Sequence, residues 1–234
     1  MAPLPSPTMQ GKSNIPIVLP SSGNIFSSTL SPGAYPSLVG WYRYGAGITI
    51  ATGVSQWNDQ SGNGYNLVQA TGALQPVLQS DNTILFNGTT QYLQASFTLN
   101  QPSTVYILFQ QVAWTSANVV SDGLTTGTMQ IIQNSGSPQL AISAGSIVDS
   151  NAGLAVGAYD VMCAVYNGAA STSKIGNGAP LIGNAGAGNG GGFTLGANGG
   201  ATVFGNIQVK EVAIFSVAHS DSIQQQLANW FHSI

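Results

Sequence analysis

The sequence is poor in charge. Only 5% of its 234 residues are Asp, Glu, Lys or Arg, whereas ordinary soluble proteins contain about 25%. Four basic side chains cannot form the clustered cationic surface that nucleic acid requires, so this class of partner is excluded. A surface for polyanions is excluded for the same reason. With so few charges, copies of the protein repel each other only weakly, which favours a place in an assembly or among neutral glycans outside a cell.

Cysteine is also scarce, and targeting segments are missing from the sequence. The single cysteine excludes an internal disulfide, and Cys163 lies in an apolar run that predicts a small buried side chain. The first residues lack the basic start and the apolar stretch of a secretory signal. No run of about 18 apolar residues predicts a membrane span. We therefore expect no membrane contact, and release by lysis or within a particle if the protein acts outside the cell.

The N-terminal segment differs in composition from the rest of the chain. Residues 1–36 contain seven of the eleven prolines, and proline fixes φ and removes a backbone donor. This composition predicts an extended, irregular arm over 1–36, followed by a domain over 37–234. The apolar side chains Ile15, Ile17, Val18 and Leu19 indicate that the arm docks along its own domain or a neighbour. A terminus with no docking role is the alternative.

Short apolar runs broken by Gly and Asn follow from Leu38 onward, which is typical of an all-β sandwich or barrel. Apolar residues on both faces of 103–110 predict a strand that is covered on both sides. The alternation shifts within 207–216, which indicates a bend or a bulge. The predicted strands are 38–42, 83–86, 92–95, 103–110, 129–133, 139–143, 159–167, 192–196 and 207–216.

One short helix is predicted near the C-terminus. Ser220 or Asp221 can cap it, and Gln224 follows Asp221 at the spacing of a capping box. Apolar residues then recur at helical spacing, which predicts a stripe that packs on the sandwich.

Five sequence segments occur in an order that is known from one family. They cover residues 39–42, 57–66, 75–78, 86–93 and 205–215, and the second reads W-N-D-Q-S-G-N-G-Y-N. With them the chain resembles the LamG-like, concanavalin A-like lectin and glucanase jelly-roll domains of the bacterial and phage branch, over about residues 38–232. The resemblance implies an antiparallel jelly-roll sandwich of two sheets with an N-terminal arm and a short C-terminal helix.

The departures from this family concern its acidic residues. Arg43 and Asn87 stand where the family often has Asp, and Thr90 and Gln91 replace a pair of Asp residues, so only Asp59 is retained. Calcium requires several hard oxygen ligands, preferably anionic. We therefore expect no metal site and no cofactor.

The acids also lack the pattern of a glycosidase. Retaining glucanases of this fold need two carboxylates about 5 Å apart, but no two acids here lie within nine residues of each other. A Ser-His-Asp triad would have to use His219 or His232, and no G-x-S-x-G elbow is present. The sequence therefore predicts that the chain is not an enzyme.

The first functional hypothesis is a surface protein of a bacteriophage virion, either a capsid decoration protein or a tail-associated adhesin. The neutral composition, the arm and the family resemblance support it. We expect the arm to dock on a major capsid or tail protein, and the protein to form a homo-oligomer, a trimer or a dimer.

The second hypothesis is a carbohydrate-binding module of a bacterial extracellular protein. Exposed aromatic rings stack on sugars, and amides bond their hydroxyls. The candidates are Tyr44, Tyr65, Trp114, Asn63 and Asn66, with a plain surface or core position as the alternative for each. The two hypotheses are compatible, because a virion lectin can bind host or mucus glycans.

Overall fold

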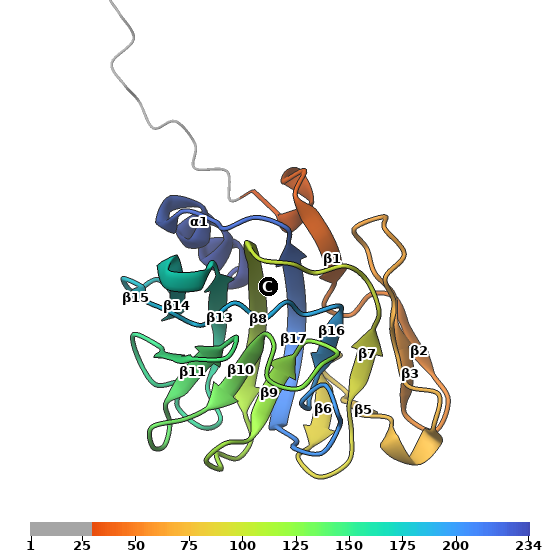
Figure 1. Ribbon diagram of the computed structural model, residues 1–234. Helices are drawn as coiled ribbons and strands as arrows, with labels where there is room; N and C mark the ends of the chain where they lie inside the picture. The colour runs from red at the N-terminus through yellow and green to blue at the C-terminus, as the bar shows by residue number, and fades with distance from the viewer. Residues whose placement is uncertain (1–29) are drawn as a thin grey trace, which may run out of the picture.

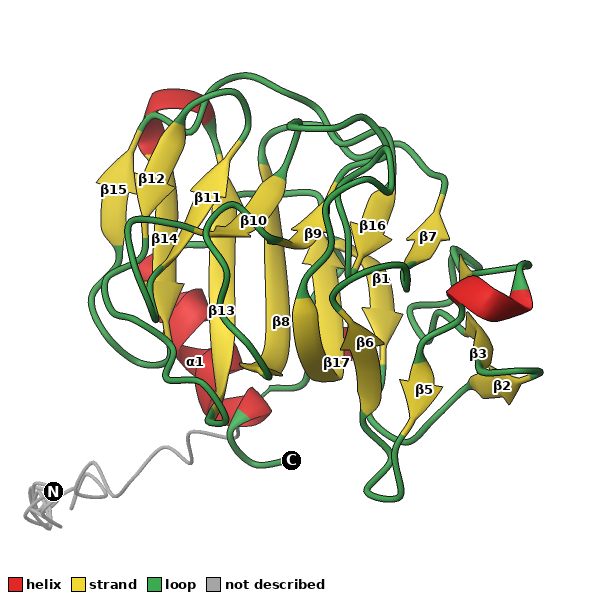
Figure 2. Ribbon diagram, turned by 90° about the horizontal axis from the view of Figure 1, so that it is seen from below, coloured by secondary structure: helices red, strands yellow, loops and turns green. Residues whose placement is uncertain are grey.

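The computed structural model describes residues 30–234. Two antiparallel sheets lie face to face, and one helix packs on the outside of the first sheet (Figures 1 and 2). The all-β, two-sheet sandwich with a short C-terminal helix is thus confirmed. The predicted docking residues Ile15, Ile17, Val18 and Leu19 lie outside the described residues, so their role stays a prediction.

Sheet A runs in the order β15-β14-β13-β8-β17-β6-β5, and β1 pairs with β17 beside this path. Its strands are β1 (Leu38–Tyr42), β5 (Val77–Leu78), β6 (Ile84–Asn87), β8 (Ser103–Gln111), β13 (Tyr159–Tyr166), β14 (Ser171–Ile175), β15 (Leu181–Gly183) and β17 (Asn206–Phe215).

Sheet B runs in the order β12-β11-β10-β9-β16-β7-β4-β3-β2. Its strands are β2 (Ile48–Ile50), β3 (Val54–Trp57), β4 (Leu67–Val68), β7 (Leu93–Ala95), β9 (Val119–Asp122), β10 (Gln130–Gln133), β11 (Leu140–Ser143), β12 (Ile147–Asp149) and β16 (Phe193–Leu195). The 3-10 turns are η1 (Pro32–Ala34), η2 (Gly72–Leu74) and η3 (Gly168–Ala170). All nine predicted strands are present, with ends shifted by a residue or less.

The main core lies between the two sheets, and β8 is buried on both of its faces. Val105, Ile107 and Phe109 point into the main core, whereas Tyr106 and Leu108 belong to a second cluster under the helix. The two-sided burial that the sequence predicts for this strand is therefore confirmed.

The shift in alternation along β17 is a β-bulge between Val209 and Glu211. Val209 and Val212 both point into the main core. The two residues between them, Lys210 and Glu211, therefore both lie on the outer side of sheet A. The bulge that the pattern of 207–216 indicates is confirmed, and it brings a cation and a carboxylate to one side of one strand.

The helix α1 (Asp221–Phe231) covers the upper outer face of sheet A. Leu227, Ala228 and Phe231 are buried against the outer side chains of the sheet, and so is Cys163, as predicted. In the described part of the chain, no helix is both long and apolar enough to cross a membrane.

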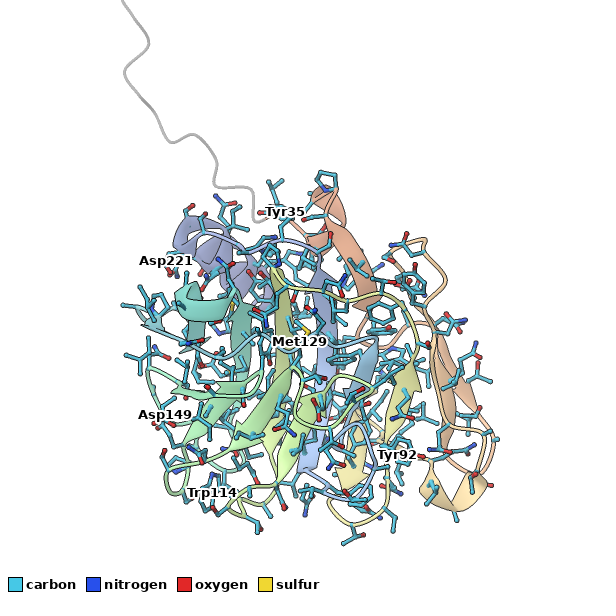
Figure 3. The ribbon with its side chains drawn as sticks, in the orientation of Figure 1. Tyr35, Tyr92, Trp114, Met129, Asp149 and Asp221 are labelled. Carbon is cyan, nitrogen blue, oxygen red and sulfur yellow. The ribbon has the colours of Figure 1, made fainter. Side chains whose placement is uncertain are left out.

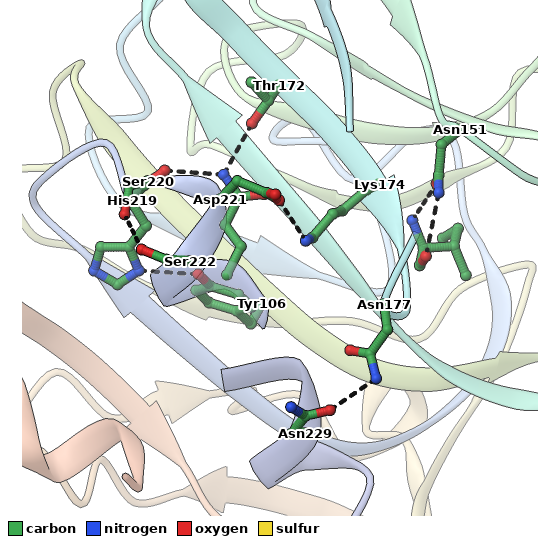
Figure 4. Close-up of polar contacts among 12 residues, drawn as sticks. Tyr106, Asn151, Thr172, Lys174, Asn177, His219, Ser220, Asp221, Ser222 and Asn229 are labelled. Atoms are coloured by element: carbon green, nitrogen blue, oxygen red, sulfur yellow. Dashed lines mark hydrogen bonds and ion pairs between the residues drawn. The ribbon is translucent and has the colours of Figure 1, made fainter. Parts of the chain in front are cut away.

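Polar contacts fasten α1 at its N-terminal end (Figure 4). Ser220, one of the two predicted candidates, is the N-cap, but its side chain makes no capping hydrogen bond. Gln224 does not complete a capping box either: its Nε2 donates to the carbonyl of His219 at 2.9 Å. Lys174 is fully buried, and its Nζ lies 2.9 Å from Asp221 Oδ1. The start of the helix is thus tied to sheet A instead of capping itself.

The end of the predicted arm touches the domain. Tyr35 packs edge-on against Phe215, with 6.0 Å between the ring centroids, and its hydroxyl donates to Gln226 Oε1 at 3.0 Å. The division into an arm over 1–36 and a domain over 37–234 stays a prediction, since residues 1–29 lie outside the described range.

Candidate functional site

Polar and aromatic side chains gather on the outer face of sheet A, on the part that α1 leaves uncovered. Thr83, Gln110, Gln208 and Lys210 adjoin Ile84, Phe109 and Val209, which point into the main core, so these side chains point outward because a strand alternates its faces. Tyr159 pairs with Gln110, and the rings of Tyr159 and Tyr44 both lie beside Lys210. We call this group the outer patch, and it consists of Tyr44, Thr83, Gln110, Tyr159, Gln208 and Lys210.

Lys210 lies between the two tyrosines of the outer patch. Its Nζ is 5.3 Å from the centroid of the Tyr44 ring and 4.9 Å from that of Tyr159. It also donates to the carbonyl of Ile234 at 3.4 Å. Such cation–π contacts are each worth about 0.5–1 kcal/mol at exposed sites. The lysine therefore holds both rings in place at the surface.

The amides of the outer patch are linked in a chain of hydrogen bonds. Gln110 Nε2 donates to Gln208 Oε1 at 2.7 Å, and Gln208 Nε2 donates in turn to Thr83 Oγ1. The hydroxyl of Tyr159 is buried; burial raises the pKa of this tyrosine, while the Thr83 hydroxyl acts in the opposite direction. The patch therefore combines ordered amides with two tyrosine rings.

Tyr44 is fixed at both ends. Its hydroxyl donates to the carbonyl of Asp81 at 2.5 Å, and its backbone N–H donates to Glu211 Oε2 at 3.1 Å. Glu211 Oε1 accepts from Trp41 Nε1 at 2.5 Å. Burial raises the pKa of Glu211 to about 6, while these two hydrogen bonds and Arg43 act in the opposite direction.

The surface of residues 30–234 contains no pocket. Small molecules usually bind in concave sites that enclose most of their surface, and the outer patch has no such hollow. Within the same residues, no group of three or more His, Cys, Asp or Glu side chains is placed to share a metal ion.

Three of the five predicted glycan-binding residues belong to one loop, 58–66. The ring of Tyr65 stacks on Phe97 with 4.8 Å between centroids. Asn63 Nδ2 donates to the carbonyl of Val39 at 3.0 Å, and Asn66 Oδ1 accepts from the N–H of Asp59 at 2.9 Å. These side chains make contacts that hold the loop.

Trp114 lies beyond the end of β8, at the lower end of the sandwich and far from Tyr35 (Figure 3). Its Nε1 donates to the carbonyl of Gln139 at 2.9 Å. Of the five candidates, the structure therefore brings only Tyr44 to the outer patch. A role in glycan binding for Trp114 and for the residues of the 58–66 loop stays a prediction.

Sequence reasoning missed Tyr159, Gln110 and Gln208 as candidate site residues. Tyr159 begins a predicted strand, and Gln208 occupies the polar side of another. The signal that could have found them is a polar residue at outward positions of an otherwise apolar strand. Their proximity depends on the register of β13, β8 and β17, in which Tyr159 pairs with Gln110 and Gln110 with Gln208.

No family model and no curated protein matches this chain. Solved structures match it at the level of the fold. A Trypanosoma rangeli sialidase in complex with sialic acid superposes with a TM-score of 0.60 at 12% identity, over 84% of this chain and 33% of the sialidase. The binding domain of paraclostridial mosquitocidal protein 1 gives a TM-score of 0.59 at 14% identity, over 86% of this chain and 53% of that one.

A GH54 α-L-arabinofuranosidase matches with a TM-score of 0.58 at 14% identity, over 76% of this chain and 50% of the arabinofuranosidase. The chain thus spans from a third to about half of these proteins. At such identities the likeness establishes the β-sandwich fold alone. The finer assignment to the LamG-like domains has no matching family model.

One prediction from the sequence is corrected by these matches. The chain was expected not to be an enzyme, because its carboxylates are few and widely spaced. The sialidase and the arabinofuranosidase are both enzymes, so the prediction is wrong in treating this fold and composition as sufficient to exclude catalysis. Spacing along the chain says little about which carboxylates meet in space.

Proposed function

We propose that this protein is a glycan-binding surface protein of a bacteriophage particle, either a capsid decoration protein or a tail-associated adhesin. In this proposal the outer patch binds a neutral polysaccharide, and the N-terminal arm docks on a major capsid or tail protein. The host or its mucus supplies the glycan.

The observation that carries the glycan-binding part is the composition of the outer patch. Tyrosine rings offer apolar faces to the C–H side of sugars, and side-chain amides and hydroxyls bond their OH groups. The patch contains two tyrosines, Tyr44 and Tyr159, and two linked glutamines. The absence of a pocket among the described residues and a charged fraction of only 5% favour a long, neutral chain over a small or anionic ligand.

The test is a glycan array with the wild-type protein, followed by affinity measurements on two variants. Gln110→Ala removes the first amide of the hydrogen-bonded chain, and Gln208→Ala removes the second. We expect each to weaken binding about three- to tenfold, as for the loss of one or two hydrogen bonds.

Gln226→Ala is the matched control, since it removes an exposed amide on α1, outside the outer patch, whose partner is Tyr35, and it should leave the affinity unchanged. Trp114→Ala tests the rival position at the end of β8. If no glycan is retained, or if only Trp114→Ala weakens binding, the outer patch is not the site.

The virion part of the proposal rests on the arm and on the low charge of the chain. We expect a variant without residues 1–29 to remain folded, because it keeps Tyr35 and its contacts with Phe215 and Gln226, and to lose attachment to particles. Co-sedimentation of the full-length and shortened proteins with intact particles measures this. Equal attachment of the two would remove the docking role, and sedimentation of the free protein reports whether it is a dimer or a trimer.

The alternative function is a carbohydrate-binding module of a bacterial extracellular protein. The match to the binding domain of a paraclostridial mosquitocidal protein favours it as the second candidate. It predicts the same glycan binding by the outer patch but no association with particles, so the co-sedimentation experiment separates the two.

A further inference from the structure

Glu211 lies directly beneath the outer patch, next to Lys210 in the β17 bulge. Only 2% of its surface is exposed. Both carboxylate oxygens accept hydrogen bonds from residues at or just after the end of β1. Oε1 accepts from Trp41 Nε1 at 2.5 Å, and Oε2 accepts from Tyr44 N at 3.1 Å. A single buried side chain therefore holds the backbone that carries the Tyr44 ring.

We propose that Glu211 is the positioning residue of the outer patch: its carboxylate fixes the backbone of Tyr44 and thereby the ring that the patch presents to a ligand. The identity of that ligand rests on the function proposed above. The positioning of Tyr44 is a property of the chain alone.

The positioning depends on whether the carboxylate is ionised. An ionised carboxylate accepts at both oxygens, whereas a protonated one has a hydroxyl that donates. Oε1 is held in the shorter bond to Trp41, so a proton on Oε2 leaves the N–H of Tyr44 without an acceptor. Because burial raises the pKa of Glu211 to about 6, the backbone N–H of Tyr44 should be bonded to Glu211 at pH 7.5 and lose this bond at pH 5.

Other charged and titratable groups surround Glu211. The guanidinium of Arg43 lies 4.8 Å from the centroid of the Trp41 ring and opposes the rise in the pKa of Glu211. On β8 the register partner of Glu211 is the apolar Leu108. Groups on neighbouring elements include Lys210 on the same strand, Tyr44 and Asp81 across the patch, and Asp59, which accepts from Trp41 N at 2.9 Å. Others are Tyr159 and Asp160 on β13, and His232 with the terminal residue Ile234 after α1.

The decisive experiment follows the backbone amide resonance of Tyr44 and the indole N–H of Trp41 by NMR between pH 4.5 and 8. We expect both to titrate with a midpoint near pH 6 in the wild type, and neither to do so in Glu211→Gln. His232→Gln is the control, because it removes the imidazole that bonds Asp160 and leaves the Glu211 carboxylate in place, so it should keep the midpoint. A Tyr44 amide that does not titrate, or that titrates equally in Glu211→Gln, overturns the proposal.

A second measurement links the positioning to binding. With the glycan that the array identifies, wild-type affinity should fall about tenfold from pH 7.5 to pH 5, the loss expected for one hydrogen bond to a charged group. Glu211→Gln should bind weakly at both pH values. An array that retains no glycan refutes the proposed function, while the NMR titration still decides whether Glu211 positions Tyr44. A pH-independent affinity with a titrating amide would refute the link between them.

Discussion

At the scale of single residues, carboxylates of this chain hold backbone segments in place by accepting hydrogen bonds from their N–H groups. Asp122 is fully buried at the end of β9, and its two oxygens accept from the N–H groups of Gly123, Gly127 and Gly199 at 2.8–3.1 Å. Thr128 N, Met129 N and Gln130 Nε2 complete the set. One side chain thereby anchors the loop after β9 and the loop after β16, which lie far apart in the sequence.

Replacing Asp122 by Asn should lower the free energy of unfolding by about 2–3 kcal/mol, because the amide turns an N–H toward backbone donors and leaves one of them buried without an acceptor. Urea denaturation followed by tryptophan fluorescence measures this. Asp149→Asn serves as the control: Asp149 is half-buried and accepts only from the side chains of Asn134 and Ser135, so its loss should be about 1 kcal/mol or less. Equal losses would refute the anchoring role of Asp122.

The site shows how far residue types alone lead. The sequence predicts both Tyr44 and Tyr65 as candidates because exposed aromatic rings stack on sugars. Both are half-buried, but Tyr44 lies on the outer patch, whereas the ring of Tyr65 stacks on Phe97. The contacts of each ring are decided by neighbours that are remote in the sequence, so composition could not separate the two.

At the scale of elements, α1 supplies a second core for sheet A. Tyr106 stacks on Phe231 with 5.8 Å between centroids, and Leu227 and Ala228 are completely buried beside them. Without the helix, the outer side chains of β8, β13 and β17 would face water. The helix is therefore an integral layer of the fold.

Leu227→Ala should destabilise the protein by about 2–4 kcal/mol, through lost burial and the cavity that remains. Asn229→Ala on the same helix should change stability by less than about 0.5 kcal/mol, since Asn229 is exposed and its partner Asn177 bonds it across the surface. Thermal unfolding of both variants tests this. A small effect of Leu227→Ala would indicate that α1 contributes little to the stability of the fold.

The elements that could be predicted are those with a strong local pattern. The apolar strands β8, β13 and β17 and the helix stripe were all visible in the sequence. The missed strand β14 reads Ser-Thr-Ser-Lys-Ile, and its burial depends on α1 and on the ion pair of Lys174 with Asp221. Strands of two or three residues such as β4, β5 and β15 carry too few side chains to show an alternation.

At the scale of the whole molecule, two buried groups act in opposite directions on the pH dependence of stability. Burial lowers the pKa of His219 to about 4 from 6.5, and raises that of Glu211 to about 6 from 4.5. Unfolded His219 binds its proton first as the pH falls, so stability is lost between pH 6.5 and 4. Folded Glu211 binds its proton first, so stability is gained between pH 6 and 4.5.

Each pH unit between the folded and unfolded pKa values changes the free energy of unfolding by about 1.4 kcal/mol. Protonation of His219 therefore lowers the free energy of unfolding by about 3 kcal/mol, and protonation of Glu211 raises it by about 2 kcal/mol. The wild type should therefore lose only about 1 kcal/mol from these groups between pH 6.5 and 4. His219→Asn, which can keep a bond to the Tyr106 hydroxyl, should reverse the slope and gain stability over the same range. Urea denaturation at several pH values measures both; a slope of the same sign in the variant would contradict this account.

The bulge in β17 has a consequence for how this protein can change over time. Val209 and Val212 point into the main core on either side of the bulge. The additional residue between them is therefore not needed for the pairing of β17 with β8. Deleting Lys210 would restore perfect alternation, keep the core side chains of β17 on their present face and remove the cation of the outer patch. The outer patch can thus change through the length of β17 as well as through substitution.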